Sequence, residues 1–140
     1  KRCTTVTFEM AAALVNQSSI NCIAMTPNNL NELDAMVLDF LKKVPTAWDE
    51  TRFLAGYPGK YVVLARRHGD RWYIAGLNAE EKAISVNIDM KELAGQRVAL
   101  YSDTKAAAPI EAACKLKEVK VDKKGRLTVT MQPNGGVVIL

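Results

Sequence analysis

Histidine is almost missing from this 140-residue sequence, in which His68 is the single example. A catalytic triad needs a histidine beside a nucleophile, and no Gly-x-Ser-x-Gly elbow accompanies this one. His68 stands in a Gly-Asp loop sequence, where a solvated turn residue is the simpler interpretation. No glycine-rich phosphate loop is present either, because Gly135-Gly136 is typical of a turn before a last strand. We therefore expect no complete catalytic site in this chain.

Cysteine is also scarce. Cys3, Cys22 and Cys114 are odd in number, widely spaced, and outside any CxxC or Cys/His pair. A structural zinc site needs about four such ligands, so this kind of metal site is excluded. Cys22 lies in an apolar run, which predicts a buried thiol.

Long apolar runs are missing as well. No run approaches the roughly 20 residues of a membrane span, and the start at Lys1 has no signal-peptide pattern. The first residue is not Met, and a helical pattern follows at once, so we expect the interior or tail of a longer polypeptide. Hydrophobic residues at 49% and charged residues at 24% are typical of a folded protein.

Positive charge is concentrated in one stretch. Between Lys115 and Arg126 there are six basic residues and two acids, in a chain of net charge +4. They alternate with apolar residues, which predicts the solvated face of a hairpin. A nucleic-acid or membrane surface usually adds exposed aromatics or a recognisable motif, so neither partner is expected.

Two helices are expected first. Apolar residues recur at helical spacing from Phe8, which predicts a helix over 5–25 that is apolar around much of its circumference and needs cover on more than one side. The polar residues 16–19 interrupt this pattern, and they either end the helix or form a turn. Thr26 can cap a second helix with Pro27 at its first position, and Pro45 ends it.

After Pro45 the apolar period changes to two. Short strands separated by turn residues are expected, with 61–65 central and covered on both faces, and 84–90 the cleanest alternation. A skipped alternation predicts a bulge near Lys117-Glu118. The predicted fold class is mainly β: an antiparallel β-sandwich of about seven or eight strands, or a closely related barrel, preceded by two α-helices. Residues 1–44 form the helical segment and 45–140 the β-domain.

The acids and aromatics offer few sites. Asp49 and Glu50 are adjacent, so on a strand they point to opposite faces and cannot easily share a glycosidase cleft; capping the sheet or pairing with Arg52 is favoured. Aromatic residues make up 6% of the chain. The candidate sugar or interface contacts are Trp48, Tyr57 and Trp72. The simpler expectation for Trp48 is packing at the helix–sheet joint. Trp72 and Tyr73 are consecutive on a strand, so we expect only one of the two to be buried.

One stretch resembles a known family. Residues 44–67 read VPTAWDETRFLAGYPGKYVVLARR, and residues 69–76 read GDRWYIAG. They are similar to a P-T-x-W-D-E/D-T-R-x-L-x-G segment followed by G-x-Y-V-V-x-A-R-R and G-D-x-W-Y in the carboxyl-terminal part of glycoside hydrolase family 97. Weaker similarity extends upstream, and the family pattern is broken around residues 16–31.

The resemblance implies a parent enzyme with a catalytic (β/α)8 barrel, whose last helices would be residues 4–43, and a terminal β-domain. It implies hydrolysis of α-glucosides or α-galactosides, an active-site calcium ion held upstream, and a periplasmic or secreted bacterial location. No catalytic, cofactor or metal residue is carried over to this chain. The expected partners are the parent's barrel and, through self-association, a second copy.

Three functions remain open at this point. The leading hypothesis is an accessory domain that stabilises the barrel or joins subunits, with its apolar helical faces buried against the sandwich or another copy. The alternatives are a carbohydrate-binding module and an interaction domain unrelated to catalysis. An independent enzyme is the weakest hypothesis.

Overall fold

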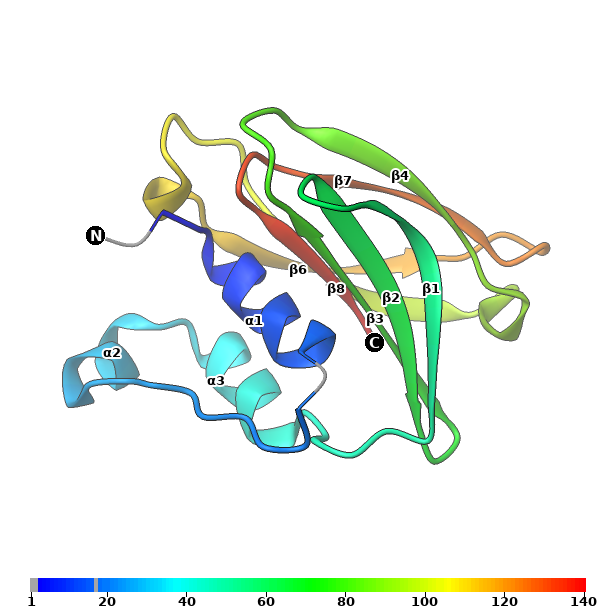
Figure 1. Cartoon of the computed structure of the whole chain (residues 1–140), viewed down its shortest axis with the longest axis horizontal. Coiled ribbons are helices and arrows are strands. Elements are labelled where there is room, and N and C mark those ends of the chain that lie inside the picture. Colours follow the sequence, from blue (N-terminus) through cyan, green and yellow to red (C-terminus); the bar gives the residue numbers. More distant parts are fainter. Residues whose placement is uncertain (1–2, 17) are drawn as a thin grey trace.

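The computed structural model describes residues 3–16 and 18–140. Outside the described residues lie Lys1 and Arg2 at the chain start, and Gln17, which falls within the first predicted helix. In this part of the chain, three short α-helices precede eight strands in two antiparallel sheets (Figure 1), which confirms the sandwich class. The elements are α1 (Val6–Val15), α2 (Pro27–Glu32), α3 (Ala35–Lys43), β1 (Glu50–Tyr57), β2 (Tyr61–His68), β3 (Arg71–Asn78), β4 (Ile84–Asp89), β5 (Arg97–Asp103), β6 (Cys114–Lys120), β7 (Arg126–Met131) and β8 (Gly136–Ile139), with 3-10 turns η1 (Lys91–Leu93) and η2 (Pro109–Glu111).

The first helix is shorter than predicted. Thr5 caps α1, its side-chain oxygen accepting from the amide of Phe8 at 3.0 Å. The helix ends at Val15, so the predicted extent to residue 25 is wrong, and the interruption at residues 16–19 is where the helix stops. The polar stretch after Val15 competes for backbone hydrogen bonds, and residues 18–26 return along the helices without regular structure. The side-chain amide of Asn21 ties this return segment to the carbonyl of Ala13 at 3.0 Å.

The second predicted helix is divided in two. It begins after Thr26 and ends before Pro45 as expected, but α2 stops at Glu32. Asp34 then caps a new helix, α3, by accepting from the amide of Met36 at 3.1 Å. An aspartate at this position satisfies the free amides of a helix start, and this favours the break.

The strands build two unequal sheets. The larger has the order β1-β2-β3-β8-β5-β6, and β4 pairs with β7 in the smaller. β4 confirms its predicted alternation, with Val86 and Ile88 buried and Ser85 and Asn87 exposed. The core between the sheets is built from side chains of both, among them Val63, Ile74, Ile88, Val129, Met131 and Ile139.

The other face of the large sheet carries the helices. Met10 and Leu14 of α1 form a second buried cluster with Tyr73 and Val138, which lie on β3 and β8. The approach is close: a Cβ placed on Gly136 would lie 2.8 Å from the carbonyl oxygen of Thr7. Burial of the helical layer against the sandwich is therefore confirmed, and the molecule has three layers in Figure 1.

Strand β2 is less covered than predicted. Val63 and Ala65 are buried toward the small sheet, but Val62 and Leu64, on the helix side, are only half-buried. The reason is the placement of α1, which packs over β3, β8 and part of β5. The strands covered on both faces are β3 and β8, whose side chains contribute to both core clusters.

Two details of the later strands are also corrected. β6 pairs with β5 from Cys114 to Lys120 without a register shift, so the bulge predicted near Lys117-Glu118 is absent from this described pairing; a bulge lies instead in β1, between Phe53 and Ala55. As an exposed edge strand, β6 has little need for strict alternation.

The basic stretch does not form a hairpin. β6 belongs to the large sheet and β7 to the small one, and the connection crosses between them. Asp122 shapes this crossing, because its carboxylate accepts from the amides of Lys124 and Arg126 at 2.8 and 2.7 Å. Those hydrogen bonds hold the pKa of Asp122 below its ordinary value. The basic side chains are nevertheless solvated: Lys115, Lys117, Lys120, Lys123, Lys124 and Arg126 are all exposed.

Candidate functional site

The adjacent carboxylates at the start of β1 already have partners. Asp49 Oδ2 accepts from the amide of Gly69 at 2.8 Å. Glu50 Oε1 accepts from Arg52 Nε at 2.6 Å, as predicted, and its other oxygen lies 3.5 Å from Arg67 Nε. The hydrogen bond from Arg52 lowers the pKa of Glu50. A general acid needs a raised pKa, so this carboxylate is suited to an ion pair rather than to proton donation.

Arg52 connects this pair to the neighbouring turn and strand. It also donates to Glu92 of η1, and its guanidinium carbon lies 4.4 Å from the ring centroid of Trp72. Hydrogen bonds to Glu50 and Glu92 raise the pKa of Arg52, while the pKa of Glu92 is lowered by a hydrogen bond to its own backbone and by Arg52. The cluster neutralises itself and stacks on an aromatic ring, as expected of a structural network.

The chain offers no evident metal or triad chemistry where it is described. Within residues 3–16 and 18–140, no group of three or more His, Cys, Asp or Glu could hold a metal ion. These residues do not fit the calcium ion that the family resemblance implies. His68 is an exposed hairpin residue whose ring Nδ1 lies 2.9 Å from the carbonyl oxygen of Ala47.

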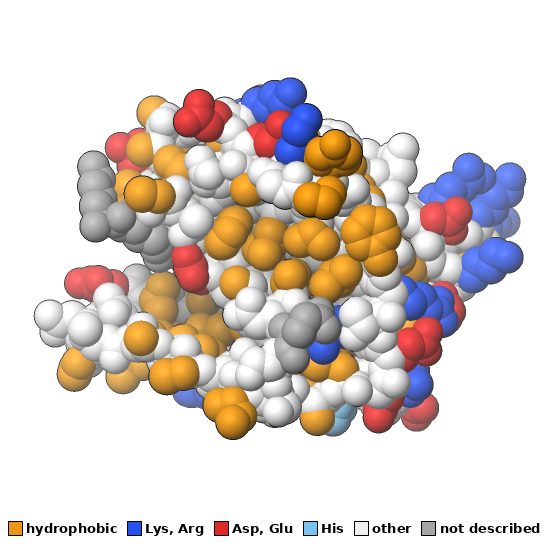
Figure 2. All heavy atoms as spheres, in the orientation of Figure 1, with side chains coloured by type: hydrophobic (Ala, Val, Ile, Leu, Met, Phe, Trp, Pro, Cys, Tyr) orange, Lys and Arg blue, Asp and Glu red, His pale blue; other side chains and the backbone are white. Residues whose placement is uncertain are grey.

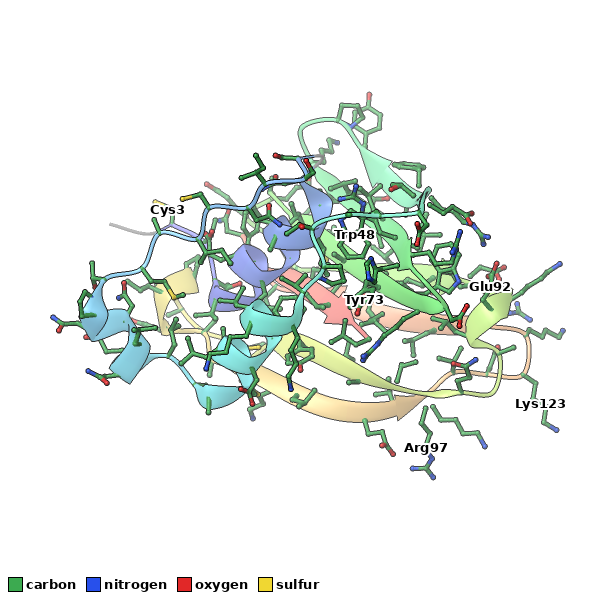
Figure 3. All side chains as sticks on the ribbon, turned by 90° about the horizontal axis from the view of Figure 1, so that it is seen from below. Cys3, Trp48, Tyr73, Glu92, Arg97 and Lys123 are labelled. Carbon is green, nitrogen blue, oxygen red and sulfur yellow. The ribbon has the colours of Figure 1, made fainter. Side chains whose placement is uncertain are left out.

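The three aromatic candidates lie at three separate places. Trp48 packs edge-on against Tyr73 on the helix side, with ring centroids 5.3 Å apart (Figure 3), so its position at the helix–sheet joint is as expected. Trp72 is half-buried on the opposite face, against the inter-sheet core. Tyr57 is 63% exposed at the far end of β1, next to Lys60. These rings do not form the shared platform that sugar stacking needs.

Arg66 joins the helical segment to the sheet. Only 7% exposed, it donates from Nη1 to the carbonyl oxygens of Leu14 and Asn16, both at 2.9 Å. Its Nε donates to Thr51 Oγ1 at 3.0 Å, and its guanidinium carbon lies 4.9 Å from the ring centroid of Trp48. Burial lowers the pKa of Arg66. The charge is placed at the negative end of α1, where free carbonyls stabilise a cation.

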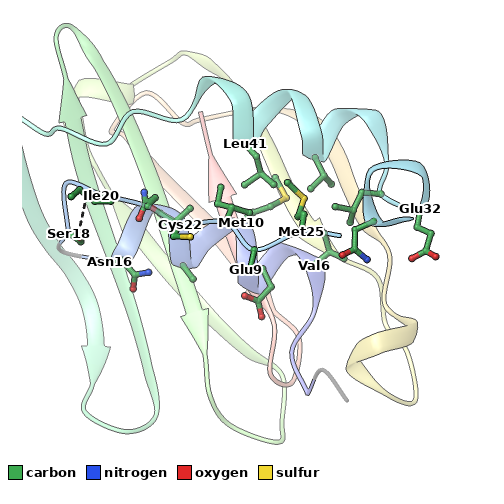
Figure 4. Close-up of a pocket in the computed structure, with 18 of the residues that line it drawn as sticks. Val6, Glu9, Met10, Asn16, Ser18, Ile20, Cys22, Met25, Glu32 and Leu41 are labelled. Carbon is green, nitrogen blue, oxygen red and sulfur yellow. Dashed lines mark hydrogen bonds between the residues drawn. The ribbon is translucent and has the colours of Figure 1, made fainter. Parts of the chain in front are cut away.

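A cleft of about 1210 Å³ opens in the helical layer. Its walls are α1, the return segment, α2 and α3, and Ile110 of η2 also lines it. Met10, Leu41, Met25 and Cys22 project around it (Figure 4). Part of this wall is uncovered: Ile20 is 80% exposed, and Ile23 and Met25 are 39% and 37% exposed. Cys22 is also exposed, so the predicted buried thiol is wrong; the return segment lies over the helices rather than inside the core.

The residues missed by sequence reasoning are Arg66 and Phe53. Arg66 follows Val62 and Leu64 at two-residue spacing, so its side chain is expected on the same face of β2, toward the helices. An arginine on a covered face indicates that it has a buried hydrogen-bond partner. Phe53 is 66% exposed on the edge strand β1, although it stands in an otherwise strand-like apolar run. None of the described helices is long and apolar enough to cross a bilayer.

One curated relative resembles the chain over nearly its whole length, and a second resembles it over about half. A retaining alpha-galactosidase of Bacteroides thetaiotaomicron is 31% identical over 134 residues, which are 94% of this chain and 20% of that protein. A probable retaining alpha-galactosidase of Streptomyces bingchenggensis is 41% identical over 68 residues, 49% of this chain and 11% of that protein.

Solved structures also resemble the chain over nearly its whole length. A crystal structure of a beta-arabinopyranosidase matches 99% of this chain and 21% of its own chain, with 42% identity and a TM-score of 0.92. A glycoside hydrolase family 97 enzyme from Pseudoalteromonas sp. strain K8 matches 99% of this chain and 22% of its own, with 25% identity and a TM-score of 0.80. The chain thus spans about a fifth of the length of the relatives that it matches from end to end.

The family assignment rests on the β-domain. The family model that matches residues 47–140 is described as glycosyl-hydrolase 97 C-terminal, oligomerisation. These residues include every strand of both sheets in the described chain. The chain belongs to the family of glycosyl-hydrolase 97 C-terminal oligomerisation domains.

Proposed function

We propose that this chain is the C-terminal portion of a larger family 97 glycoside hydrolase, in which its helical layer packs against the catalytic barrel and its β-sandwich joins two copies of the enzyme. The observation that carries the first half is the uncovered cleft beside α1, with Ile20, Ile23 and Met25 exposed around it. Exposed apolar surface of this kind is typical of a face that another part of a protein covers.

The tight connection between the two segments supports the same proposal. Arg66 and Gly136 hold α1 directly on the sheet. A barrel that packs on the outer side of this layer would therefore be held in a fixed position relative to the β-sandwich. In this arrangement the domain contributes stability and subunit contacts, and the catalytic carboxylates lie elsewhere in the polypeptide.

The substrate class is proposed from the relatives. Two curated relatives are named as alpha-galactosidases and one solved relative as a beta-arabinopyranosidase. Of the two classes that the family resemblance implies, α-galactosides are therefore the proposed substrates of the parent enzyme. We also propose that it binds calcium through residues outside this chain and acts in the periplasm or outside the cell.

Thiol labelling tests the docking of the helical layer. Cys22 lies in the cleft wall and is exposed. In the isolated chain we expect it to react quickly with a maleimide, and in the parent enzyme at least about tenfold more slowly, because the barrel covers it. Peptide-resolved mass spectrometry separates it from Cys114, the control, whose pKa is raised by burial and which reacts slowly in both proteins. Equal labelling of Cys22 in the two proteins would contradict the docking.

Activity assays test the proposed substrate class and the absence of catalysis by this chain alone. The parent enzyme is expected to hydrolyse nitrophenyl α-galactoside faster than nitrophenyl α-glucoside, whereas the purified 140-residue chain hydrolyses neither. If hydrolytic activity stayed with the isolated chain through two chromatography columns, a purely accessory role would be contradicted.

A further inference from the structure

The two edges of the large sheet differ in a way that bears on how copies associate. β1 forms one edge and β6 the other. An open edge presents unpaired backbone amides and carbonyls to any other strand, and proteins commonly protect such edges with charge. The side chains along each edge therefore indicate whether it is protected or available.

Strand β6 is protected. Lys115, Lys117, Glu118 and Lys120 supply four charges in seven residues, and all four are exposed. A second copy of β6 brought alongside would place an excess of lysines close together.

The second half of β1 has no such protection. Residues 53–57 read FLAGY and contain no charge, and the charges of Glu50 and Arg52 are already paired with each other. Phe53 is 66% exposed and Tyr57 63% exposed. On the helix side, half-buried Val62 and Leu64 of β2 pair with Gly56 and Phe53 and extend the apolar area inward from the edge. Figure 2 shows hydrophobic side chains gathered across this face beside α1.

We propose that two copies of this chain associate edge to edge through β1, in antiparallel pairing about a two-fold axis, with Phe53 as the anchor. The inference rests on the self-association half of the proposed function and names the surface that performs it. An antiparallel strand paired with itself is self-complementary, as a two-fold interface requires. It brings the exposed part of the Phe53 ring in one copy near the small residues Ala55 and Gly56 of the other. Within each copy the same ring lies against its own Gly56, 3.2 Å from a Cβ placed there, and an aromatic ring over an edge glycine stabilises the strand.

The same geometry predicts a closed dimer. Each copy uses the β1 edge, whose second half is uncharged, and the edges left at the two ends are the charged β6 strands. The bulge between Phe53 and Ala55 also restricts the length over which β1 can pair. Growth into a longer assembly is therefore disfavoured.

Sedimentation equilibrium of the 140-residue chain, from about 1 to 500 μM, tests the proposal. The wild-type chain is expected to form dimers, and Phe53→Lys to weaken the dimerisation constant at least about tenfold. Leu116→Lys on β6, where the leucine is 44% exposed, is the matched control and should leave it within about twofold. Because both side chains are exposed, far-UV circular dichroism should show an unchanged fold for both variants.

Hydrogen exchange then separates strand pairing from simple contact of side chains. Backbone amides in residues 51–57 should exchange more slowly at high than at low protein concentration, while those of β6 should not change. A chain that stays monomeric, a dimer insensitive to Phe53→Lys, or a dimer with unprotected β1 amides would each overturn the proposal. The Cys22 labelling test does not depend on any of these three outcomes. Docking of the helical layer to the barrel can therefore be confirmed or contradicted separately from pairing through β1.

Discussion

Arg66 Nη1 lies 2.9 Å from the carbonyl oxygen of Leu14, although 52 residues separate them in the chain. The same nitrogen donates to the carbonyl oxygen of Asn16, so one guanidinium serves a carbonyl of the last turn of α1 and the carbonyl of its C-cap residue. Through this contact the sheet supplies the C-terminal cap that the helix's own sequence lacks, since its last turn contains no basic residue.

Replacing Arg66 should loosen the helical layer. Arg66→Met keeps much of the apolar stem and removes the hydrogen bonds to Leu14, Asn16 and Thr51. We expect a loss of about 2–4 kcal/mol in the free energy of unfolding, because buried carbonyls lose a charged donor. Urea denaturation measures it. Arg67→Met is the control: its ion pairs at 3.5 and 3.9 Å are partly exposed, and its hydrogen bond to the carbonyl of Gly69 at 2.7 Å is exposed, so the loss should stay below about 1 kcal/mol. Equal losses in the two variants would show that the cap contributes nothing specific.

Gly136→Ala should separate α1 from β8. The added Cβ would lie 2.8 Å from the carbonyl oxygen of Thr7 and 2.9 Å from the Cα of Phe8, and backbone atoms cannot turn aside as a flexible side chain can. We expect a loss of about 1–3 kcal/mol, measured by urea denaturation, with faster hydrogen exchange in α1. In Gly59→Ala the new Cβ meets nothing within 4 Å and only the positive φ of 76° is strained, so α1 exchange should stay unchanged. Unaltered α1 exchange in Gly136→Ala would contradict the close packing.

Acid should weaken the fold partly through Glu50. Its pKa is lowered in the folded chain, chiefly by the hydrogen bond from Arg52, so its contribution is present above the unfolded-state pKa and is lost as the pH falls through the lower folded-state value. The melting temperature should therefore fall between about pH 5 and pH 3, and less steeply in Glu50→Gln. Glu32→Gln, on the exposed surface of α2, is the control and should follow the wild type. A Glu50→Gln profile parallel to that of the wild type would refute this role.

Sugars should not bind at Trp72. Its ring is stacked on Arg52 and half-buried against the inter-sheet core, and Trp48 and Tyr57 lie elsewhere. Isothermal titration of the chain with galactose or maltooligosaccharides, up to about 10 mM, should give no saturable heat. Trp72→Ala should lower stability instead, by about 1–3 kcal/mol, because the ring packs against the core. Saturable binding that disappears in a folded Trp72→Ala variant would favour the carbohydrate-binding alternative.

Local features of the fold were predictable from the sequence where they depend on nearby residues. The alternation from Ile84 to Met90, the Gly69-Asp70 turn and the stop before Pro45 each follow from neighbouring side chains and backbone geometry. The Glu50–Arg52 pair was predictable for the same reason, since residues two apart on a strand share a face. The family resemblance at residues 44–76 added the identity of the domain.

The candidate surfaces were much less predictable. Exposure of Cys22 depends on the return segment lying over α1 and α3, and exposure of Phe53 depends on a bulge and on the limited reach of the helical layer over β2. The sequence shows an apolar run in both places and does not show which neighbour fails to cover it.

The sequence by itself determined the period of each segment, and hence two helical stretches followed by an antiparallel β-sandwich, because hydrophobic alternation and turn residues act over a few positions. Only the tertiary structure decided that β7 leaves β6 to pair with β4, that α1 covers β3 and β8, and that Arg66 meets the end of α1. These contacts join segments tens of residues apart, and their partners are selected by the packing of whole layers.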